Sequence, residues 1–367
     1  MKKLVTTALG IAISAGAATA GGIDRSGQSI SAIYEKGTYA ELSFGYISPS
    51  VSGNDVALFG GNASGNTAAD YTQLGAAYKQ DLSDKLSFAI VIDQPFGADI
   101  SYPVGKSIAL GGTYAKVDAT AVTGVLRYKL SDRFSVHVGA RADRASAVVG
   151  LGGAAYGAVS GYQVNLDDNT GYGYLIGAAY EIPDIALRVA LTYNSSIEHD
   201  FKTVESGSLG PGTSTTKVKT PQSINLEFQS GVAADTLVFG SIRWVKWSEF
   251  KVDPAVLVGA TGSGLVDIDN TTTYTLGVGR KLNDTWAGSA LISYEKKGDP
   301  LVSPLAPTAG RFGVGLAAIY SKNNMKITTG VQYVWLGDAK PRTAGTARAN
   351  FNDNNALAIG VKVGFNF

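Results

Sequence analysis

The strongest constraint on the fold is an alternation of apolar residues with small or polar ones that recurs along nearly the whole chain. In the last segment an unbroken apolar series alternates with small or polar residues, namely Leu357, Ile359, Val361, Val363, Phe365 and Phe367 against Ala358, Gly360, Lys362, Gly364 and Asn366. Because successive side chains of a β-strand point to opposite faces, this pattern predicts a strand with one purely apolar face. Similar alternation occurs in 172–180, 185–193, 312–320 and 327–335.

Such segments predict strands at fourteen places: 38–48, 70–80, 85–94, 113–130, 134–151, 171–182, 185–206, 213–233, 235–254, 271–282, 285–298, 311–322, 325–339 and 354–367. The connections alternate in length with few exceptions. Turns such as 131–133 and 283–284 alternate with long loops such as 49–69 and 152–170. Short turns at one end and long loops at the other are typical of outer-membrane barrels. The sequence therefore predicts an all-β fold, a transmembrane antiparallel β-barrel of about 14 strands.

The apolar end of the chain also fits a barrel. A closed barrel pairs its last strand with its first, so no edge leaves unsatisfied backbone groups in lipid. No segment after residue 20 approaches the ~20 apolar residues that a spanning helix needs. A soluble β-sandwich or propeller is the alternative, but it would not need outward Tyr and Leu on so many strands.

The first residues have the layout of an export signal. Two lysines precede a short apolar stretch, and A-T-A at 18–20 supplies a cleavage site of the A-x-A kind. We therefore assign residues 1–20 to a cleaved signal peptide. Residues 21–37 lack a clean alternation, and we expect either a short N-terminal hatch in the lumen or a periplasmic leader. Residues 38–367 are assigned to the barrel.

Composition excludes several function classes. The chain has no Cys, which rules out metal–thiolate sites, thiol catalysis and disulfides together. A formal net charge of +1 gives no electrostatic case for nucleic acid. The glycine motifs GVGRKL and GVGLAA lie inside strand alternation and open no helix, so they do not predict nucleotide binding. No metal site and no cofactor are expected.

A barrel of this size has a lumen wider than its own side chains can fill, so the inward residues are the candidate functional ones. On the non-apolar phase of the strands lie five cations: Arg127, Arg141, Arg188, Lys246 and Arg311. Each is a candidate for a substrate carboxylate, although inward charges in barrels also pair with each other, and Asp93, Asp143 and Glu227 share this face. Four apolar residues face inward against the pattern, which suits an apolar binding site: Leu175, Leu291, Ile319 and Val334.

Four stretches of the sequence resemble the FadL/TodX (OMPP1) family of outer-membrane transporters for long-chain fatty acids and other hydrophobic compounds. They are a Thr-Pro strand, turn and W-x-x-F hairpin (Thr220–Phe250), a proline-bearing loop leading to an Arg-Phe strand start (Asp299–Tyr320), a Pro-x-Gly break (Asp93–Pro103), and the last strand. The chain is a short member by this comparison. It departs from the family in its short N-terminal segment, which contains no Asn-Pro-Ala element.

The resemblance implies passive transport by a monomer in the outer membrane of a Gram-negative bacterium. Substrate would be captured at the outer loops, held at an apolar lumenal site and released sideways through a gap in the third strand. The gap would lie at Asp93, Gln94, Pro95, Phe96 and Gly97, where proline cannot donate a ladder bond and glycine weakens the strand. Pro in a strand can also mark only its end. The implied partners are long-chain fatty acids or other hydrophobic molecules, outer-membrane lipid and lipopolysaccharide, and the barrel assembly machinery.

Two alternatives from other classes remain at this point. A general or small-solute porin would show few inward apolar residues, which weakly disfavours it here. A membrane-embedded hydrolase would need a serine and histidine with an orienting group, but the two histidines, His137 and His199, lie in predicted strands and no motif singles out a serine such as Ser289 or Ser293. We therefore do not expect an enzyme.

Overall fold

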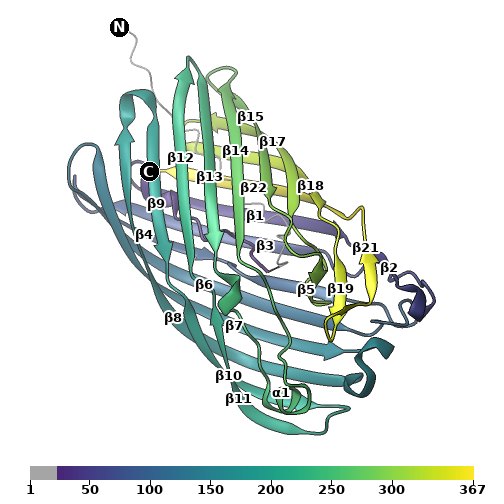
Figure 1. Cartoon of the computed structure of the whole chain (residues 1–367). Coiled ribbons are helices and arrows are strands. Elements are labelled where there is room, and N and C mark those ends of the chain that lie inside the picture. Colours follow the sequence, from purple (N-terminus) through teal and green to yellow (C-terminus); the bar gives the residue numbers. More distant parts are fainter. Residues whose placement is uncertain (1–22) are drawn as a thin grey trace.

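The computed structural model describes residues 23–367, which form a closed antiparallel barrel of fourteen strands (Figure 1). This confirms the predicted all-β barrel; the signal peptide assigned to 1–20 lies outside the described residues. The strands are β1 Tyr39–Ser50, β3 Tyr71–Asp81, β4 Leu86–Asp93 continued by β5 Gly97–Ser101, β6 Tyr114–Lys129, β7 Phe134–Leu151, β8 Tyr162–Ile182, β9 Leu187–Asn194 continued by β10 Ile197–Ser206, β11 Gly212–Thr220 continued by β12 Ser223–Ala233, β13 Thr236–Val245, β14 Thr271–Lys281, β15 Trp286–Glu295, β17 Arg311–Lys322, β18 Met325–Leu336 and β22 Asn355–Asn366.

The last strand closes the barrel against the first. β22 pairs with β1 from Tyr39 opposite Asn366 to Ser50 opposite Asn355, and β1 pairs on its other side with β3. The backbone N–H of Phe367 also donates to the carbonyl of Thr38 at 2.9 Å. Because β22 also pairs with β18, the apolar C-terminal strand has partners on both sides, as lipid requires.

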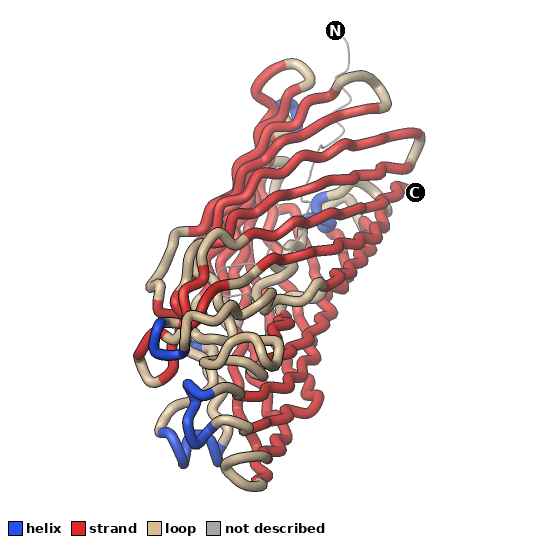
Figure 2. Tube along the Cα trace, turned by 90° about the vertical axis from the view of Figure 1, so that its right-hand side faces the viewer, coloured by secondary structure: helices blue, strands red, loops and turns tan. Residues whose placement is uncertain are grey.

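The two ends of the barrel differ. The C-terminus lies at the end with short turns, whereas the longer loops and most helical turns gather at the other end (Figures 1 and 2). The smaller elements are β2 Gly53–Asp55, β16 Leu301–Val302, β19 Lys340–Thr343, β20 Thr346–Ala347, β21 Ala349–Phe351, the helix α1 Ala255–Thr261, and the 3₁₀ turns η1 Ser31–Tyr34, η2 Ala57–Phe59, η3 Ala154–Val159, η4 Pro183–Ile185 and η5 Trp247–Glu249. Within residues 23–367 no helix is long and apolar enough to cross a membrane.

The outer surface carries the apolar face of the strands. Leu42, Leu74 and Ile176 are more than half exposed, although they lie within regular strands. Aromatic pairs stand at the short-turn end, where the ring centroids of Phe134 and Tyr180 are 4.8 Å apart. An apolar belt edged by aromatic residues fits the lipid hydrocarbon and its interface.

Several predicted boundaries were wrong for local reasons. The predicted strands 185–206 and 213–233 are each broken in two, because the Ser195 hydroxyl replaces a ladder partner for the N–H of Tyr174 and Pro221 has no N–H. β8 starts before the predicted 171, because its first residues have no apolar outer face. The predicted loop 95–112 contains β5, and the strand predicted over 235–254 ends at Val245.

Residues 23–37 lie against the lumenal face of the barrel. Asp24 accepts two bonds from Arg243, at 2.7 and 3.1 Å. Further along, the Tyr34 ring lies between the guanidinium groups of Arg127 and Arg188, at 4.7 and 4.6 Å, and its hydroxyl is 3.2 Å from Nδ1 of His137. This segment therefore occupies lumen space and is held along its length.

Candidate functional site

An apolar cavity lies in the loop half of the lumen. Its walls are residues of the six strands β5, β6, β7, β8, β10 and β11, its floor is Ile23 and Phe96, and Trp247 and Phe250 lie on its β13–β14 side. The lining residues are Ile23, Phe96, Ala98, Ala115, Val117, Ala119, Ala145, Ser146, Ala147, Val149, Leu166, Phe201, Val218, Thr220, Pro221, Trp247, Phe250, Val252, Leu265, Val266 and Leu305. Alanine recurs on β6 and β7, and these short side chains leave the space open.

The cavity has no charged lining among the described residues, and Ser146 and Thr220 supply its only side-chain hydroxyls. Three aromatic rings of its lining meet edge to face: Trp247 is 5.7 Å from Phe96 and 5.9 Å from Phe250, measured between ring centroids. Such a surface binds apolar molecules through burial and ring contacts. A carboxylate placed here would lose its hydration without gaining a partner.

A polar layer lies next to this cavity in the lumen. Arg141 donates to Thr123 at 2.8 Å and to Asn194 at 3.3 Å. Arg243 binds Asp24 and also donates to Ser223 at 3.0 Å and to Asn225 at 2.8 Å. Both guanidinium groups therefore already donate hydrogen bonds to protein side chains, and both arginines are at most 9% exposed.

The barrel wall is interrupted where β4 ends. The β3–β4 ladder stops at the pair Ala76 and Ile92, and β5 then pairs with β6. Beyond the break, β5 meets the chain before β3 through a bridge between Ala68 and Ile100. Within the break, the N–H of Leu74 donates to the side-chain oxygen of Gln94 at 2.8 Å. A side chain thus replaces the missing ladder at this point.

The N-terminal segment pairs with residues 95–97, between β4 and β5, where β3 is no longer the neighbouring strand. Asp24 forms a β-bridge with Phe96. The N–H of Arg25 donates to the carbonyl of Pro95 and the N–H of Gly97 to the carbonyl of Ile23, both at 2.8 Å. Ser26 donates to the Asp93 carboxylate. We call Ile23–Ser26 together with Asp93–Gly97 the septum.

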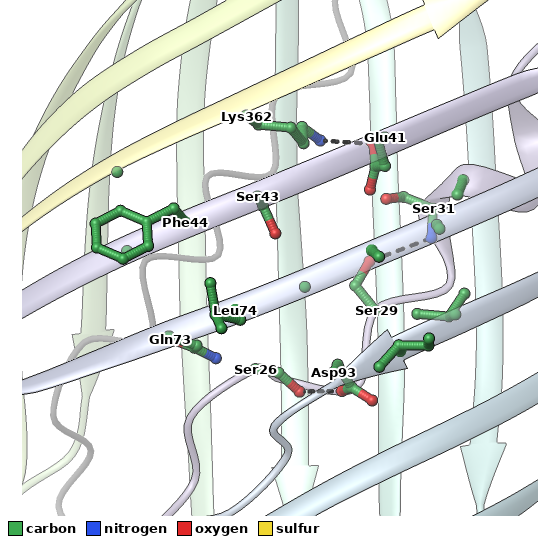
Figure 3. A pocket seen from close by; sticks show the side chains of 18 of the residues that line it. Ser26, Ser29, Ser31, Glu41, Ser43, Phe44, Gln73, Leu74, Asp93 and Lys362 are labelled. Atoms are coloured by element: carbon green, nitrogen blue, oxygen red, sulfur yellow. Dashed lines mark hydrogen bonds and ion pairs between the residues drawn. The ribbon is translucent and has the colours of Figure 1, made fainter.

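A second pocket, which we call the wall pocket, lies along β22, β1, β3 and the end of β4. Figure 3 shows Ser26 meeting Asp93 on one side of β3 and Lys362 meeting Glu41 on the other. Unlike the cavity, it combines polar and apolar residues, with Ser29, Ser31, Ser43, Gln73 and Thr328 also in its lining. Ile23 and Phe96 line the cavity while Ser26 and Asp93 line the wall pocket, so the septum separates the two.

Comparison with known proteins decides the family. The model of the family described as "Outer membrane protein transport protein (OMPP1/FadL/TodX)" matches residues 2–367. The chain belongs to the OMPP1/FadL/TodX family. The resemblance found in the sequence is thus confirmed, and with it an outer-membrane location and a transport role for hydrophobic molecules.

Solved structures of this family share the fold. A FadL homologue of Pseudomonas aeruginosa superposes with a TM-score of 0.74 at 16% identity, over 91% of each chain. The toluene transporter TodX of P. putida gives 0.67 at 14% identity over 92% of each chain. The toluene transporter TbuX of Ralstonia pickettii gives 0.63 at 13% identity, over 95% of this chain and 92% of that one. No curated protein sequence matches.

The family also settles the enzyme question, because the FadL/TodX proteins are transport channels. His137 lies between Tyr34 and Thr192, at 3.2 and 2.9 Å. His199 stacks on Phe201 and lies 3.9 Å from Asp143. Each histidine is thus buried among its own neighbours, at 1% exposure for His137 and 0% for His199.

The five predicted cations do not form one site. Arg141 lies in the polar layer, whereas Arg127 and Arg188 hold Tyr34, and Arg127 also pairs with Glu181. Arg311 lies 3.7 Å from Glu295. Lys246 follows the end of β13 and pairs with Glu249, which also binds Lys219. None of the five lines the apolar cavity.

The inward apolar residues are also dispersed. Leu175 packs with Ile30 and Ile33 of the N-terminal segment. Ile319 and Leu291 pack together on the opposite wall, and Val334 packs under the loops. Sequence reasoning missed the cavity itself, although one signal was present: the inward phase of β6 has only Ala115, Val117 and Ala119 at its loop end, whereas further along it includes Thr123 and Arg127.

Proposed function

We propose that this protein lets small hydrophobic molecules diffuse passively across the outer membrane by a sideways route. Molecules captured at the loops enter the apolar cavity, pass the septum, reach the wall pocket and leave through the break between β3 and β5. The observation that carries this proposal is the septum, since the same two short segments form the floor of the cavity, the edge of the wall break and one side of the wall pocket.

A straight route through the lumen is disfavoured by the N-terminal segment. Residues 23–37 run beneath the cavity, and bonds from Asp24, Gln28, Ser29 and Tyr34 tie them to the surrounding strands. We infer that they act as a hatch and that the wall break is the easier exit. The same contacts weigh against a general porin, which needs a continuous water-filled lumen.

The lining of the cavity favours neutral molecules over fatty acids. Among the described residues that line the cavity none is charged. Arg141, the cation of the nearby polar layer, already has protein partners. Binding of a carboxylate would strip it of water at a cost that no nearby cation offsets. Two relatives of the same fold are described as toluene transporters, and an apolar cavity edged by aromatic rings suits that kind of molecule.

We expect purified protein to bind radiolabelled ethylbenzene at least tenfold more tightly than benzoate, which has a similar size and a charge. Replacing Arg311 by Gln is expected to change ethylbenzene binding by less than about twofold, because Arg311 is paired with Glu295 away from the cavity. Equilibrium dialysis in detergent measures both.

The opposite pattern would contradict neutral specificity. If oleate or benzoate binds as tightly as the hydrocarbon and Arg311→Gln removes only the acid, the lumenal cations bind the substrate. Outward-facing Arg144→Gln serves as the control, since Arg144 is exposed and pairs with Asp168.

A further inference from the structure

The side chain of Arg25 lies in the break of the barrel wall. Its guanidinium carbon is 4.1 Å from the centre of the Tyr71 ring at the start of β3. On the other side is Gly97 at the start of β5, where an added Cβ would collide with the guanidinium group. Arg25 is only 8% exposed. The side chain thus fills space between two strands that do not pair.

The strand registers identify which faces enclose it. Gly97 is opposite Asp118, an exposed residue, whereas the neighbouring pair Ala98 and Val117 lines the cavity. Gly97 therefore faces outward, because directly paired residues share a face and faces alternate. Tyr71 is opposite Ile47, which is fully buried on the lumenal side. Arg25 thus lies between the outer face of β5 and the lumenal face of β3.

This arrangement means that β5 is displaced inward relative to β3, leaving a slit instead of a ladder. Along the slit the surroundings change from apolar to polar: Leu74 and Ile92 are exposed at the β4 end, while Asp99 of β5 and Asp118 of β6 lie near Arg25 at the other end. The slit therefore extends from the hydrocarbon belt toward the polar boundary of the membrane.

The charges around Arg25 hold it without anchoring it firmly. Asp99 and Asp118 attract the guanidinium group, and the Tyr71 ring lies against it, while burial opposes its charge. By contrast, Arg243 deeper in the lumen forms a bidentate ion pair with Asp24, donating two hydrogen bonds to its carboxylate. Arg25 is thus the more easily displaced of the two cations.

We propose that the positively charged side chain of Arg25 closes the slit and is displaced when a molecule leaves; we call this side chain the bolt. Residue 97 is glycine because a side chain on its outer face would occupy the space of the guanidinium group. The proposal rests on the sideways route of the proposed function and adds a positioning residue to it. A molecule that leaves through the slit must move the guanidinium group out from between Tyr71 and Gly97. Removing the charge should then speed exit, and restoring it should slow exit.

The test uses the natural absence of cysteine from the chain. Arg25→Cys is prepared in full-length protein and treated with methanethiosulfonate reagents that attach a cationic aminoethyl, a neutral methyl or an anionic sulfonatoethyl group. Uptake of radiolabelled ethylbenzene is measured in cells that lack other such channels. Arg144→Cys is the matched control, because Arg144 also faces outward beside a carboxylate, 2.8 Å from Asp168, but is paired with a neighbouring strand on both sides, opposite Thr120 and Thr170.

We expect Arg25→Cys to raise the uptake rate about threefold or more, with recovery of the wild-type rate only after the cationic reagent. Arg144→Cys should respond to none of the three. Equal recovery with the neutral reagent would show that Arg25 only fills space, and an unchanged rate in Arg25→Cys would overturn the bolt. Wild-type protein that takes up no hydrocarbon would instead refute the proposed function.

A second variant tests the slit without altering Arg25. Gly97→Ala should expel the guanidinium group and raise uptake as Arg25→Cys does, and the double variant should show no further increase. Additive effects would mean that the two residues act separately and would overturn the proposal. Asp118→Asn should give a smaller increase, because Asp99 remains to attract the bolt.

Discussion

Replacing Ala145 by Trp is expected to lower uptake of ethylbenzene at least tenfold. Ala145 lines the apolar cavity from β7, and an indole at this position would occupy the space that a monoaromatic molecule needs. Because the added group fills an existing apolar space, we expect the barrel to fold with little loss of stability. The rate is measured as radiolabel accumulated by cells that express each variant at equal levels.

The control for this variant is Ala140→Trp. Ala140 lies on the same strand but is exposed on the lipid face, so a tryptophan there should leave uptake unchanged. Heat-modifiable migration in gels reports whether each barrel has folded. If folded Ala145→Trp transports as fast as wild type, molecules do not pass through this cavity and the proposed route is wrong.

Replacing Arg243 by Ala is expected to release the N-terminal segment and open the lumen to ions. Arg243 binds Asp24 with two bonds and also reaches Gln28 at 3.2 Å. Removing one partner of a buried ion pair costs about 3–5 kcal/mol, which would shift docking of the segment by roughly a hundredfold or more. The barrel ladder does not depend on this pair. Single-channel conductance in planar bilayers should therefore rise severalfold.

Arg280→Ala is the matched control, because Arg280 lies on the adjacent strand β14 and is exposed on its outer phase. Arg243→Lys should raise the conductance less than Arg243→Ala does, because lysine keeps the ion pair with Asp24 but cannot form the bidentate contact. A folded Arg243→Ala barrel with wild-type conductance would show that residues 23–37 do not block the lumen.

The barrel could be predicted from the sequence because its signals are local. Alternation fixes which residues face lipid, and the lengths of the connections separate the two ends. Pro95 and Gly97 are likewise local indicators, and the ladder is interrupted beside them. Proline and glycine weaken a strand whatever surrounds them.

The sites were harder to predict because they depend on contacts between distant segments. The cavity is built from short side chains such as Ala119 and Ala145, which individually resemble ordinary lumenal positions. Arg25 gains its place only when the N-terminal segment folds back onto Asp93–Gly97. Lys246 was assigned to the lumen by extending a strand that ends at Val245. Counting inward cations could not reveal which of them already had partners.

One measurement tests the central claim most directly: hydrocarbon uptake and ion conductance recorded for the same wild-type preparation. Cells give the rate of ethylbenzene uptake, and purified protein in a planar bilayer gives the single-channel conductance with and without the hydrocarbon. A sideways route beside a closed hatch predicts rapid uptake with little or no ion conductance, unchanged by the hydrocarbon. A large, steady ion conductance in wild type, with uptake of hydrophilic solutes as well, would contradict the account and identify an open aqueous pore.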